Sequence, residues 1–413
     1  MYPDLSYFFH DLFGTEVDNW TSIFKTFGVF LVLVFLVSFF VIRSELRRHY
    51  KDGNIPTLNI KVAASSPIKD GFFNAIFGFI LGFKLPYVYQ NFETFKDDPA
   101  GMVFSTLGNM TMGIGLAVLF GIYSYVMSKN KPLTKGGVVG VHPADKAGDI
   151  ILIAALFGII GSRLFSILEN LDAFWEDPLG QLLSGSGLTI YGGLILAFIV
   201  VYAYIKRLGI PPRRMMDIAS LALLIGYGVG RMGCQFSGDG DWGIANEKPK
   251  PDWFIFPDWV WAYDYPRNVA DFYQRGVKIP DCVGKFCTHL DPPVYPTPIY
   301  EITFALICFF FLWTFRTKFK TPGRLFFTYL VLSSFARFWV ESIRVNPRYE
   351  LLGLDWSQAQ WISVVLFVTG IIGFFLVGNS SGDSGGFKST KPDYSIPDLS
   401  GGGDVAAANA ANT

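Results

Sequence analysis

Three charged residues interrupt long apolar stretches of this sequence and could do chemistry there. They are Arg231, Glu301 and Arg337. A charged side chain inside a membrane costs about 3 kcal/mol on insertion scales, and such residues usually serve a function. Arginine stays protonated and binds phosphate through two parallel hydrogen bonds. Two arginines at membrane depth therefore point to an anionic lipid head group as their ligand.

A further group follows helical spacing. Arg337, Glu341 and Arg344 lie at positions i, i+4 and i+7, so they share one face of a helix. Arg337 and Glu341 could also neutralise each other as a structural ion pair, and arginines near a helix end can extend to the nearer membrane surface. We favour a functional polar cavity, because buried charge in a membrane is expensive.

Two aspartates, Asp239 and Asp241, closely follow the apolar run that carries Arg231. Their segment, SGDGDWG, could be a turn with solvated carboxylates. The nearby arginine favours a site instead, because titratable groups with charged partners cluster at functional sites.

Other kinds of chemistry find no support in the sequence. The four histidines are not paired at ligand spacing. The sequence contains no P-loop, nucleophile elbow or zincin motif. A net charge of zero excludes a nucleic-acid binder that works by bulk electrostatics. We therefore expect no metal, no cofactor and no nucleic-acid partner.

The composition places these residues in a membrane protein. Hydrophobic residues make up 51% of the chain and charged residues 16%, whereas soluble domains carry about 25% charged residues. The apolar residues form continuous blocks, not the short alternating segments of a β-barrel. The sequence predicts an all-α fold, a polytopic transmembrane helical bundle of about seven to nine spans.

The expected spans are apolar runs long enough for a hydrocarbon core of about 30 Å. They cover residues 24–42, 72–89, 103–127, 147–168, 188–205, 218–235, 299–315, 325–343 and 361–377. The second run contains Lys84 and Pro86, so a position at the membrane interface is its alternative.

Lysines and arginines in the short loops predict the orientation. They concentrate in the loops 43–71, 128–146, 206–217 and 316–324. These loops are therefore expected in the cytoplasm, with the N-terminus outside and the C-terminus inside. With this orientation Arg163, Arg231, Glu301 and Arg337 all fall toward the outer ends of their helices. Charges from separate parts of the chain thus converge on the outer half of the membrane.

The chain divides into segments with different expected roles. These are an N-terminal segment with the first span (1–49), an insertion with two extra spans (50–146), a first core part (147–235), an exported loop domain (236–298), a second core part (299–377) and a disordered cytoplasmic tail (378–413). Cys282 and Cys287 of the exported loop could form a disulfide in an oxidising compartment or remain free thiols.

Several motifs resemble the prolipoprotein diacylglyceryl transferase family, the first enzymes of bacterial lipoprotein maturation. The segment GYGVGRMGCQFSGDGDWG at 226–243 resembles the family signature. Four further blocks resemble family motifs in the family's order: GSRLF (161–165), YGGLI (191–195), YPTPIYE (295–301) and FARFWVESIR (335–344). The matches spread over about residues 147–377. Residues 50–140 have no evident counterpart.

The resemblance implies a reaction and its participants. Such an enzyme transfers the diacylglyceryl group of phosphatidylglycerol to the lipobox cysteine thiol of an exported prolipoprotein, forming a thioether. It acts in the bacterial cytoplasmic (inner) membrane, with an active site that faces the outer leaflet. The lipid bilayer is a further partner. Arg231 and Arg337 would stabilise the phosphate of the leaving group.

The resemblance also implies a set of site residues. The expected catalytic residues are Arg231, Arg337, Glu301, Asp239 and Tyr191. The expected substrate-binding residues are Gly192, Gly193, Arg163, Gln235, Asp241, Gly243, Tyr300, Glu341 and Arg344.

The general base stays open at this point. Tyr191 stands where the family has a histidine, and a tyrosine with a pKa near 10 is a poor base at neutral pH. Tyr191 is therefore expected to position the lipid. Glu301, Asp239 and Asp241 are the candidates for the base.

Two other functions compete with the transferase. The replaced histidine would suit a non-catalytic phospholipid-binding membrane protein of the same fold. A secondary transporter would show inverted repeats and broken helices at the membrane midplane. No clear internal repeat is visible in the sequence.

Overall fold

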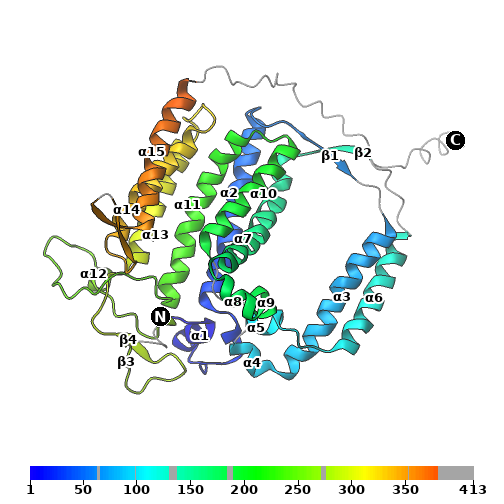
Figure 1. Ribbon diagram of the computed structural model, residues 1–413, viewed down its shortest axis with the longest axis horizontal. Coiled ribbons are helices and arrows are strands. Elements are labelled where there is room, and N and C mark those ends of the chain that lie inside the picture. Colours follow the sequence, from blue (N-terminus) through cyan, green and yellow to red (C-terminus); the bar gives the residue numbers. More distant parts are fainter. Residues whose placement is uncertain are drawn as a thin grey trace, which may run out of the picture. The chain divides into compact units, whose positions relative to one another are not determined.

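The fold is a polytopic helical bundle, as the apolar runs predict. The structure, a computed structural model, describes residues 1–62, 66–97, 99–129, 137–183, 189–270, 276–351 and 353–379. Within these residues, eight helices are long and apolar enough to cross a membrane (Figure 1). The expected disordered tail lies almost wholly outside the described residues.

The long helices correspond to the expected spans. They are α2 (Thr26–Lys51), α3 (Pro67–Gln90), α6 (Met110–Lys129), α7 (Ala147–Glu169), α10 (Ile190–Leu208), α11 (Pro212–Ser237), α13 (Thr297–Phe315), α14 (Arg324–Glu341) and α15 (Gln358–Asn379). Of these, α14 is not among the eight apolar helices. It is 18 residues long and carries Arg324, Arg337 and Glu341.

One expected span begins later than the apolar run indicates. The run 103–127 is divided, because α5 (Pro99–Phe104) ends before α6 begins at Met110. The side chain of Asn109 accepts a hydrogen bond from the Met112 backbone N–H (2.9 Å). This bond caps the first turn of α6 and fixes its start.

Short helices and three two-stranded antiparallel sheets complete the chain. The short helices are α1 (Leu5–Phe13), η1 (Trp20–Ile23), α4 (Phe92–Asp97), η2 (Pro143–Lys146), α8 (Leu171–Glu176), α9 (Pro178–Leu183) and α12 (Asp258–Trp261). The sheets pair β1 (Leu58–Val62) with β2 (Gly137–Val141), β3 (Gly276–Lys278) with β4 (Thr288–Leu290), and β5 (Arg348–Leu351) with β6 (Leu354–Ser357). These strands lie outside the membrane-spanning helices, so they do not alter the expected fold class.

Helix α11 lies at the centre of the packing. It contacts α2, α13 and α14, and half of its apolar window is buried, the largest share among the eight spans. Its glycines allow the close approach to α2: a Cβ atom on Gly226 would lie 3.1 Å from Ser38 Oγ, and one on Gly233 would lie 3.0 Å from Phe30 Cβ. Because α11 is enclosed, its polar side chains must find protein partners.

The insertion leaves the bundle as a helical hairpin. Helices α3 and α6 pack against each other, and a Cβ atom on Gly78 or Gly82 would collide with the α6 backbone. Strands β1 and β2 lie at either end of the α3–α6 segment and pair in register, Leu58 opposite Val141. The β1–β2 sheet therefore joins the two ends of the segment that contains the two extra spans.

The end of the bundle remote from the aspartates is pinned by buried charge. Glu45 of α2 ion-pairs with Arg48 (2.6 Å) and with Arg316 (2.9 Å), the latter just after α13. Asp217 of α11 accepts the backbone N–H groups of Gly323 (2.7 Å) and Phe326 (2.9 Å). These contacts cap α14 and tie α2, α11 and α13 together.

Candidate active site

Glu301 connects the arginines that the sequence singles out. Its Oε2 lies 2.9 Å from Nε of Arg231, and its Oε1 lies 2.9 Å from Nη1 of Arg337. Nη1 of Arg344 lies 3.6 Å from Oε2. One carboxylate therefore joins α11, α13 and the end of α14, and three separate parts of the sequence meet at this point.

The outer carboxylates of the cluster continue the network. Glu341 Oε2 pairs with Arg337 (2.9 Å) and lies 3.9 Å from Nε of Arg344. Asp241 pairs with Arg344 through Oδ1 (2.6 Å) and with Arg231 through Oδ2. The spacing of Arg337, Glu341 and Arg344 predicts one shared helix face. The Arg337–Glu341 pair confirms it for these two residues, whereas α14 ends at Glu341 and Arg344 reaches the cluster from the segment that follows.

The cluster is electrically balanced. Three guanidinium groups face three carboxylates, and the Glu301 and Glu341 side chains are 3% and 0% exposed. Each arginine holds an acidic partner, as the structural interpretation expects. The functional role of the arginines stays a prediction. Removal of one charge would leave its partners buried without compensation, which is costly at low dielectric.

A glycine-rich turn brings Asp241 back to the helices. Helix α11 ends where Gly238 adopts a left-handed conformation (φ 64°). The Gly243 N–H donates to Tyr295 O, and the Ile244 N–H donates to Ile343 O, both at 2.8 Å. A Cβ atom on Gly243 would lie 2.6 Å from Ile343 O, so only glycine fits. Gly243, expected to bind substrate, thus positions the aspartate loop against the end of α14.

The two aspartates of this loop differ in their surroundings. Burial raises the pKa of Asp241, but Arg231 and Arg344 outweigh this effect and hold the pKa of that carboxyl below its usual range. Burial raises the pKa of Asp239, with Asp241 as a further contribution. Among the described residues, no lysine or arginine forms an ion pair with Asp239. It is the one carboxylate here that is free of such a partner.

Two predicted substrate-binding residues support the loop between α11 and α13. The Gln235 side chain is buried and accepts a hydrogen bond from the Tyr265 hydroxyl (2.8 Å). The Tyr300 hydroxyl donates to Val260 O (2.7 Å). Both contacts tie the loop 246–290 to the ends of α11 and α13, next to the charged cluster. A direct contact of either residue with substrate stays a prediction.

The remaining predicted residues lie on the α7–α10 pair. Gly192 and Gly193 are buried where α10 meets α7, and a Cβ atom on either would collide with that helix. Arg163 is a buried residue of α7, and Tyr191 is 45% exposed at the start of α10. In the described part of the chain, no hydrogen bond joins Tyr191 to the cluster. Helix α10, which begins at Ile190, starts at the end of the bundle at which α11 ends, so its first turn lies at the cluster's end (Figure 1).

Tyr227 is a member of the site that sequence reasoning missed. Its hydroxyl donates to Glu301 Oε1 (2.7 Å), and the Arg231 guanidinium lies 5.2 Å from the centre of its ring. Tyr227 precedes Arg231 by one helical turn in GYGVGR, so the i, i+4 spacing was the available signal. Cations over an aromatic face gain a further attraction.

A metal ion has little support at this site. The ligand atoms of Cys234, Asp239 and Asp241 lie within 4.8 Å of one another. Both oxygens of Asp241 already face arginines, which repel a cation.

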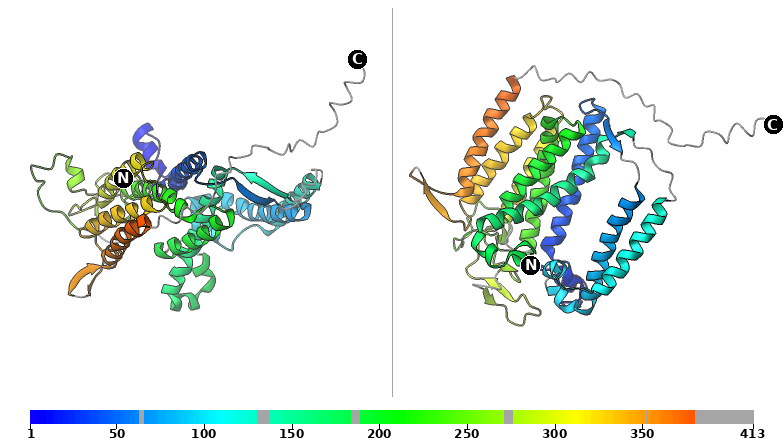
Figure 2. Two further views of the ribbon diagram at one scale, coloured as in Figure 1. Left: turned by 90° about the horizontal axis from the view of Figure 1, so that it is seen from above. Right: turned by 45° about the vertical axis from the view of Figure 1, so that its right-hand side comes forward.

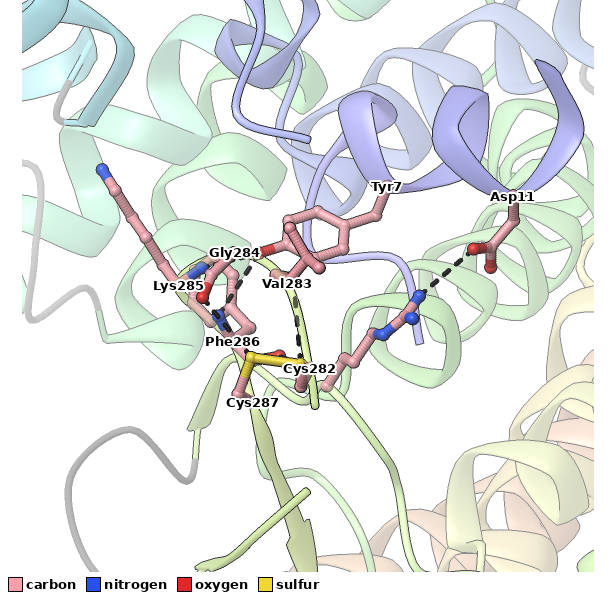
Figure 3. Close-up of a disulfide and its surroundings, with 9 residues drawn as sticks. Tyr7, Asp11, Cys282, Val283, Gly284, Lys285, Phe286 and Cys287 are labelled. Atoms are coloured by element: carbon pink, nitrogen blue, oxygen red, sulfur yellow. Dashed lines mark hydrogen bonds and ion pairs between the residues drawn. A yellow bond between two sulfur atoms is a disulfide. The ribbon is translucent and has the colours of Figure 1, made fainter. Parts of the chain in front are cut away.

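A disulfide anchors the N-terminal segment near the site. Cys282 and Cys287 are bonded, which decides between the two alternatives that the sequence left open (Figure 3). Within the loop they close, the N–H groups of Lys285 (2.9 Å) and Phe286 (3.3 Å) donate to the fully buried Tyr7 hydroxyl. Arg267 pairs with Asp11 at 3.2 Å. The loop thereby fixes α1 beside the end of α11.

Comparison with known proteins identifies the family. Residues 102–376, more than half of the chain, match the family described as prolipoprotein diacylglyceryl transferase. The chain belongs to this family. The match begins inside the segment 50–146, which the sequence set apart as an insertion. Family membership makes the chain an enzyme of the transferase class.

Curated relatives carry the same description at modest identity. Phosphatidylglycerol–prolipoprotein diacylglyceryl transferase of Lysinibacillus sphaericus is 28% identical over 260 residues, covering 62% of this chain and 84% of the relative. The protein of that name from Clostridium tetani is 26% identical over 277 residues, covering 66% and 96%. The one from Dehalococcoides mccartyi is 29% identical over 234 residues, covering 55% and 77%.

Proposed function

We propose that this chain transfers the diacylglyceryl group of phosphatidylglycerol to the lipobox cysteine thiol of exported prolipoproteins. The observation that carries the proposal is the meeting of Arg231, Arg337 and Arg344 around Glu301. Family membership and the names of the relatives support both substrates. The pattern of basic loops supports a site that faces the outer leaflet of the bacterial cytoplasmic membrane.

The reaction is a substitution at carbon. The thiolate sulfur of the prolipoprotein attacks the glyceryl carbon that bears the phosphate. A carbon–sulfur bond forms, the carbon–oxygen bond to phosphate breaks, and glycerol phosphate leaves with the bonding electrons. The phosphate group gains one negative charge in this step, since a phosphodiester becomes a phosphomonoester.

The arginine cluster suits the leaving group. Because three carboxylates already balance the three guanidiniums, the cluster does not attract anions through net charge. Its donors are held in place by Glu301, Glu341 and Asp241, so they need little reorganisation when charge develops. Donors arranged in this way stabilise the transition state more than the ground state. Arg337, 29% exposed, offers the most accessible guanidinium of the three.

Asp239 is the best-placed base for the thiol. Glu301 is shared among arginines and Tyr227, and Asp241 faces two arginines, so both are weak proton acceptors. Asp239 forms no ion pair with a lysine or arginine among the described residues, and burial raises its pKa although Arg231 opposes the shift. A carboxylate of raised pKa accepts a proton more readily. The thiol of the substrate, with a pKa of about 8.5, needs such help at neutral pH.

Tyr227 and Glu341 act as positioning residues in this proposal. Tyr227 holds Glu301 Oε1 by its hydroxyl and supports Arg231 by its ring. Glu341 holds Arg337 and accepts hydrogen bonds from Ser357 (2.9 Å) and Asn346 (2.5 Å). Side chains fixed from two sides keep their rotamers, which keeps the donors aimed.

The test is complementation in cells depleted of their own prolipoprotein diacylglyceryl transferase. The wild-type chain should restore lipoprotein modification, and Arg231→Ala or Arg337→Ala, produced at equal levels, should not. Lipid bound to the purified chain distinguishes the transferase from the non-catalytic alternative. Bound phosphatidylglycerol in the purified wild-type chain, without any modified lipoprotein, would favour the non-catalytic alternative.

A further inference from the structure

The loop between α11 and α13 exposes a group of large apolar side chains, here called the aromatic loop (residues 253–259). The exposed fractions of Trp253, Ile255, Phe256 and Trp259 are 73%, 87%, 56% and 51%. Solvent-exposed apolar groups of this size usually mark a contact with a partner or a membrane. The transfer reaction proposed above does not use these residues.

The aromatic loop is held firmly at the end of α13. The Tyr300 hydroxyl donates to Val260 O (2.7 Å), and the Trp261 ring nitrogen donates to Lys248 O (2.9 Å). The Trp261 ring also lies 5.9 Å from the Tyr295 ring. Tyr300 precedes Glu301 in α13, so the residue that follows the aromatic loop, Val260, is bonded to the helix position next to Glu301.

The length of α13 sets the depth of this anchor. Its 19 residues span about 28 Å, close to the thickness of the hydrocarbon core. The first turn, which contains Tyr300, therefore lies at the boundary between hydrocarbon and head groups. In Figure 1 the loop bearing α12 extends sideways at the level where α13 begins and α14 ends. Strands β3 and β4 lie beyond that level. Seen from above, in the left view of Figure 2, this loop reaches out to the side of the helices.

Tryptophan and phenylalanine favour this boundary. Their rings gain from burial among acyl chains, and the indole N–H can face the polar head groups. On α14, Phe335 and Trp339 are also exposed apolar side chains. The aromatic loop therefore continues the lipid-facing surface of the bundle sideways.

We propose that the aromatic loop inserts into the head-group region of the bilayer leaflet on the cluster's side. Its partner is the phospholipid surface. The insertion places an apolar edge directly beside Tyr300 and Glu301, where a phospholipid reaches the charged cluster from the membrane. The insertion itself rests only on the membrane-spanning fold, whereas the role in lipid access rests on the proposed function.

Spin labels measure the depth directly in the full chain, reconstituted in vesicles of phosphatidylglycerol and phosphatidylcholine. The label is attached to Ile255→Cys, with Ile307→Cys on the exposed face of α13 as the membrane control and Lys278→Cys in β3 as the aqueous control. The native free cysteines, Cys234 and Cys308, are buried. Collision with oxygen and with a water-soluble nickel complex reports the surroundings of each label.

We expect the label at 255 to favour oxygen over nickel, as at 307, and the label at 278 to show the reverse. Equal nickel access at 255 and 278 would overturn the insertion. Protection of 255 that appears only after a lipobox peptide is added would also overturn it, because the partner would then be a polypeptide.

A kinetic measurement tests the role in lipid access. The variant Trp253→Ser/Ile255→Ser/Trp259→Ser should raise the phosphatidylglycerol concentration needed for half-maximal rate about tenfold and leave kcat unchanged. A KM equal to wild type would contradict this role. The spin-label result stands without any turnover, so failure of the proposed function and failure of the insertion are distinguishable.

Discussion

Glu301 holds Arg231 on one carboxylate oxygen and Arg337 on the other, each at 2.9 Å. The two arginines are more than a hundred residues apart in the sequence, yet one side chain fixes the distance between them. This arrangement makes the carboxylate the organising group of the site.

The variant Glu301→Gln should disrupt both stability and turnover. The amide keeps the shape of the side chain but leaves the buried cluster with one excess positive charge. Loss of one partner from a buried ion pair costs about 3–5 kcal/mol. Thermal unfolding in detergent and product formation measure the two effects. Glu350→Gln, in the exposed strand β5, is the control and should change stability by less than about 0.5 kcal/mol. Wild-type unfolding of Glu301→Gln would show that the carboxylate does not balance the arginines.

The variants Arg231→Lys and Arg337→Lys test whether geometry or charge alone matters. Lysine keeps the positive charge and loses the planar fork of donors. Loss of a preorganised donor costs about 10²–10³ in kcat. Steady-state kinetics should therefore show a fall in kcat of this size. Arg348→Lys, on the exposed hairpin, should retain activity. Full activity of both site variants would mean that point charges suffice.

The sequence predicts which residues lie at the same end of the bundle, but not which of them form ion pairs with one another. The apolar runs predicted the spans, and the basic loops grouped Arg163, Arg231, Glu301 and Arg337 at one end of the bundle. Local spacing also predicted the shared face of Arg337 and Glu341. Such inferences need only the period of a helix and the alternation of membrane crossings.

Contacts between helices depend on packing, which local spacing does not encode. Tyr227 could be tied to Arg231 by spacing, but its bond to Glu301 depends on how α11 lies against α13. The double pairing of Asp241 likewise depends on the turn at Gly238 and on the bridge between Gly243 and Arg344. The β1–β2 sheet joins segments separated by the whole α3–α6 hairpin, and no short-range signal predicts it.

Tyr191 and Tyr227 can be compared directly. The family resemblance selects Tyr191, whereas the contact with Glu301 selects Tyr227. Tyr227→Phe removes the hydrogen bond to Glu301 and retains the ring beneath Arg231, so kcat should fall about tenfold with KM nearly unchanged. Tyr191→Phe should only weaken turnover. Because Tyr191 is expected to position the lipid, loss of its hydroxyl should act mainly by raising KM. Tyr227→Leu removes the ring as well and should be worse than Tyr227→Phe. Equal kinetics for wild type and Tyr227→Phe would remove this residue from the site.

The pH dependence of kcat/KM should report Asp239. A base must be ionised, so activity falls as the pH drops through its pKa, and burial places that pKa above the usual value of about 3.9. Asp239→Asn should lower kcat/KM about 10²–10⁴-fold and abolish the acid limb. Asp281→Asn, an exposed substitution in the same loop domain, should leave the profile unchanged. An unaltered acid limb in Asp239→Asn would assign the base elsewhere.

The pKa of Asp241 is shifted in the opposite direction to that of Asp239, and this shift affects the stability of the fold. Its pKa is depressed in the folded chain, so its ion pairs stabilise the fold at pH values above the unfolded pKa, near 3.9. This contribution is lost as the pH falls through the folded pKa. Asp241→Asn should therefore destabilise the chain at neutral pH and have little effect under strongly acidic conditions. Unfolding followed across this pH range in detergent provides the check, and an equal effect at all pH values would contradict the ion pairs.

The most direct measurement follows both products with purified protein, phosphatidylglycerol and a synthetic lipobox peptide. Mass spectrometry detects the diacylglyceryl thioether on the peptide cysteine, and an enzymatic assay detects the released glycerol phosphate. The wild-type chain should form the two in equal amounts, and folded Arg231→Ala and Arg337→Ala should form neither. Wild-type rates in either arginine variant, or no thioether from a folded wild-type chain, would contradict the assignment of this cluster as the catalytic centre.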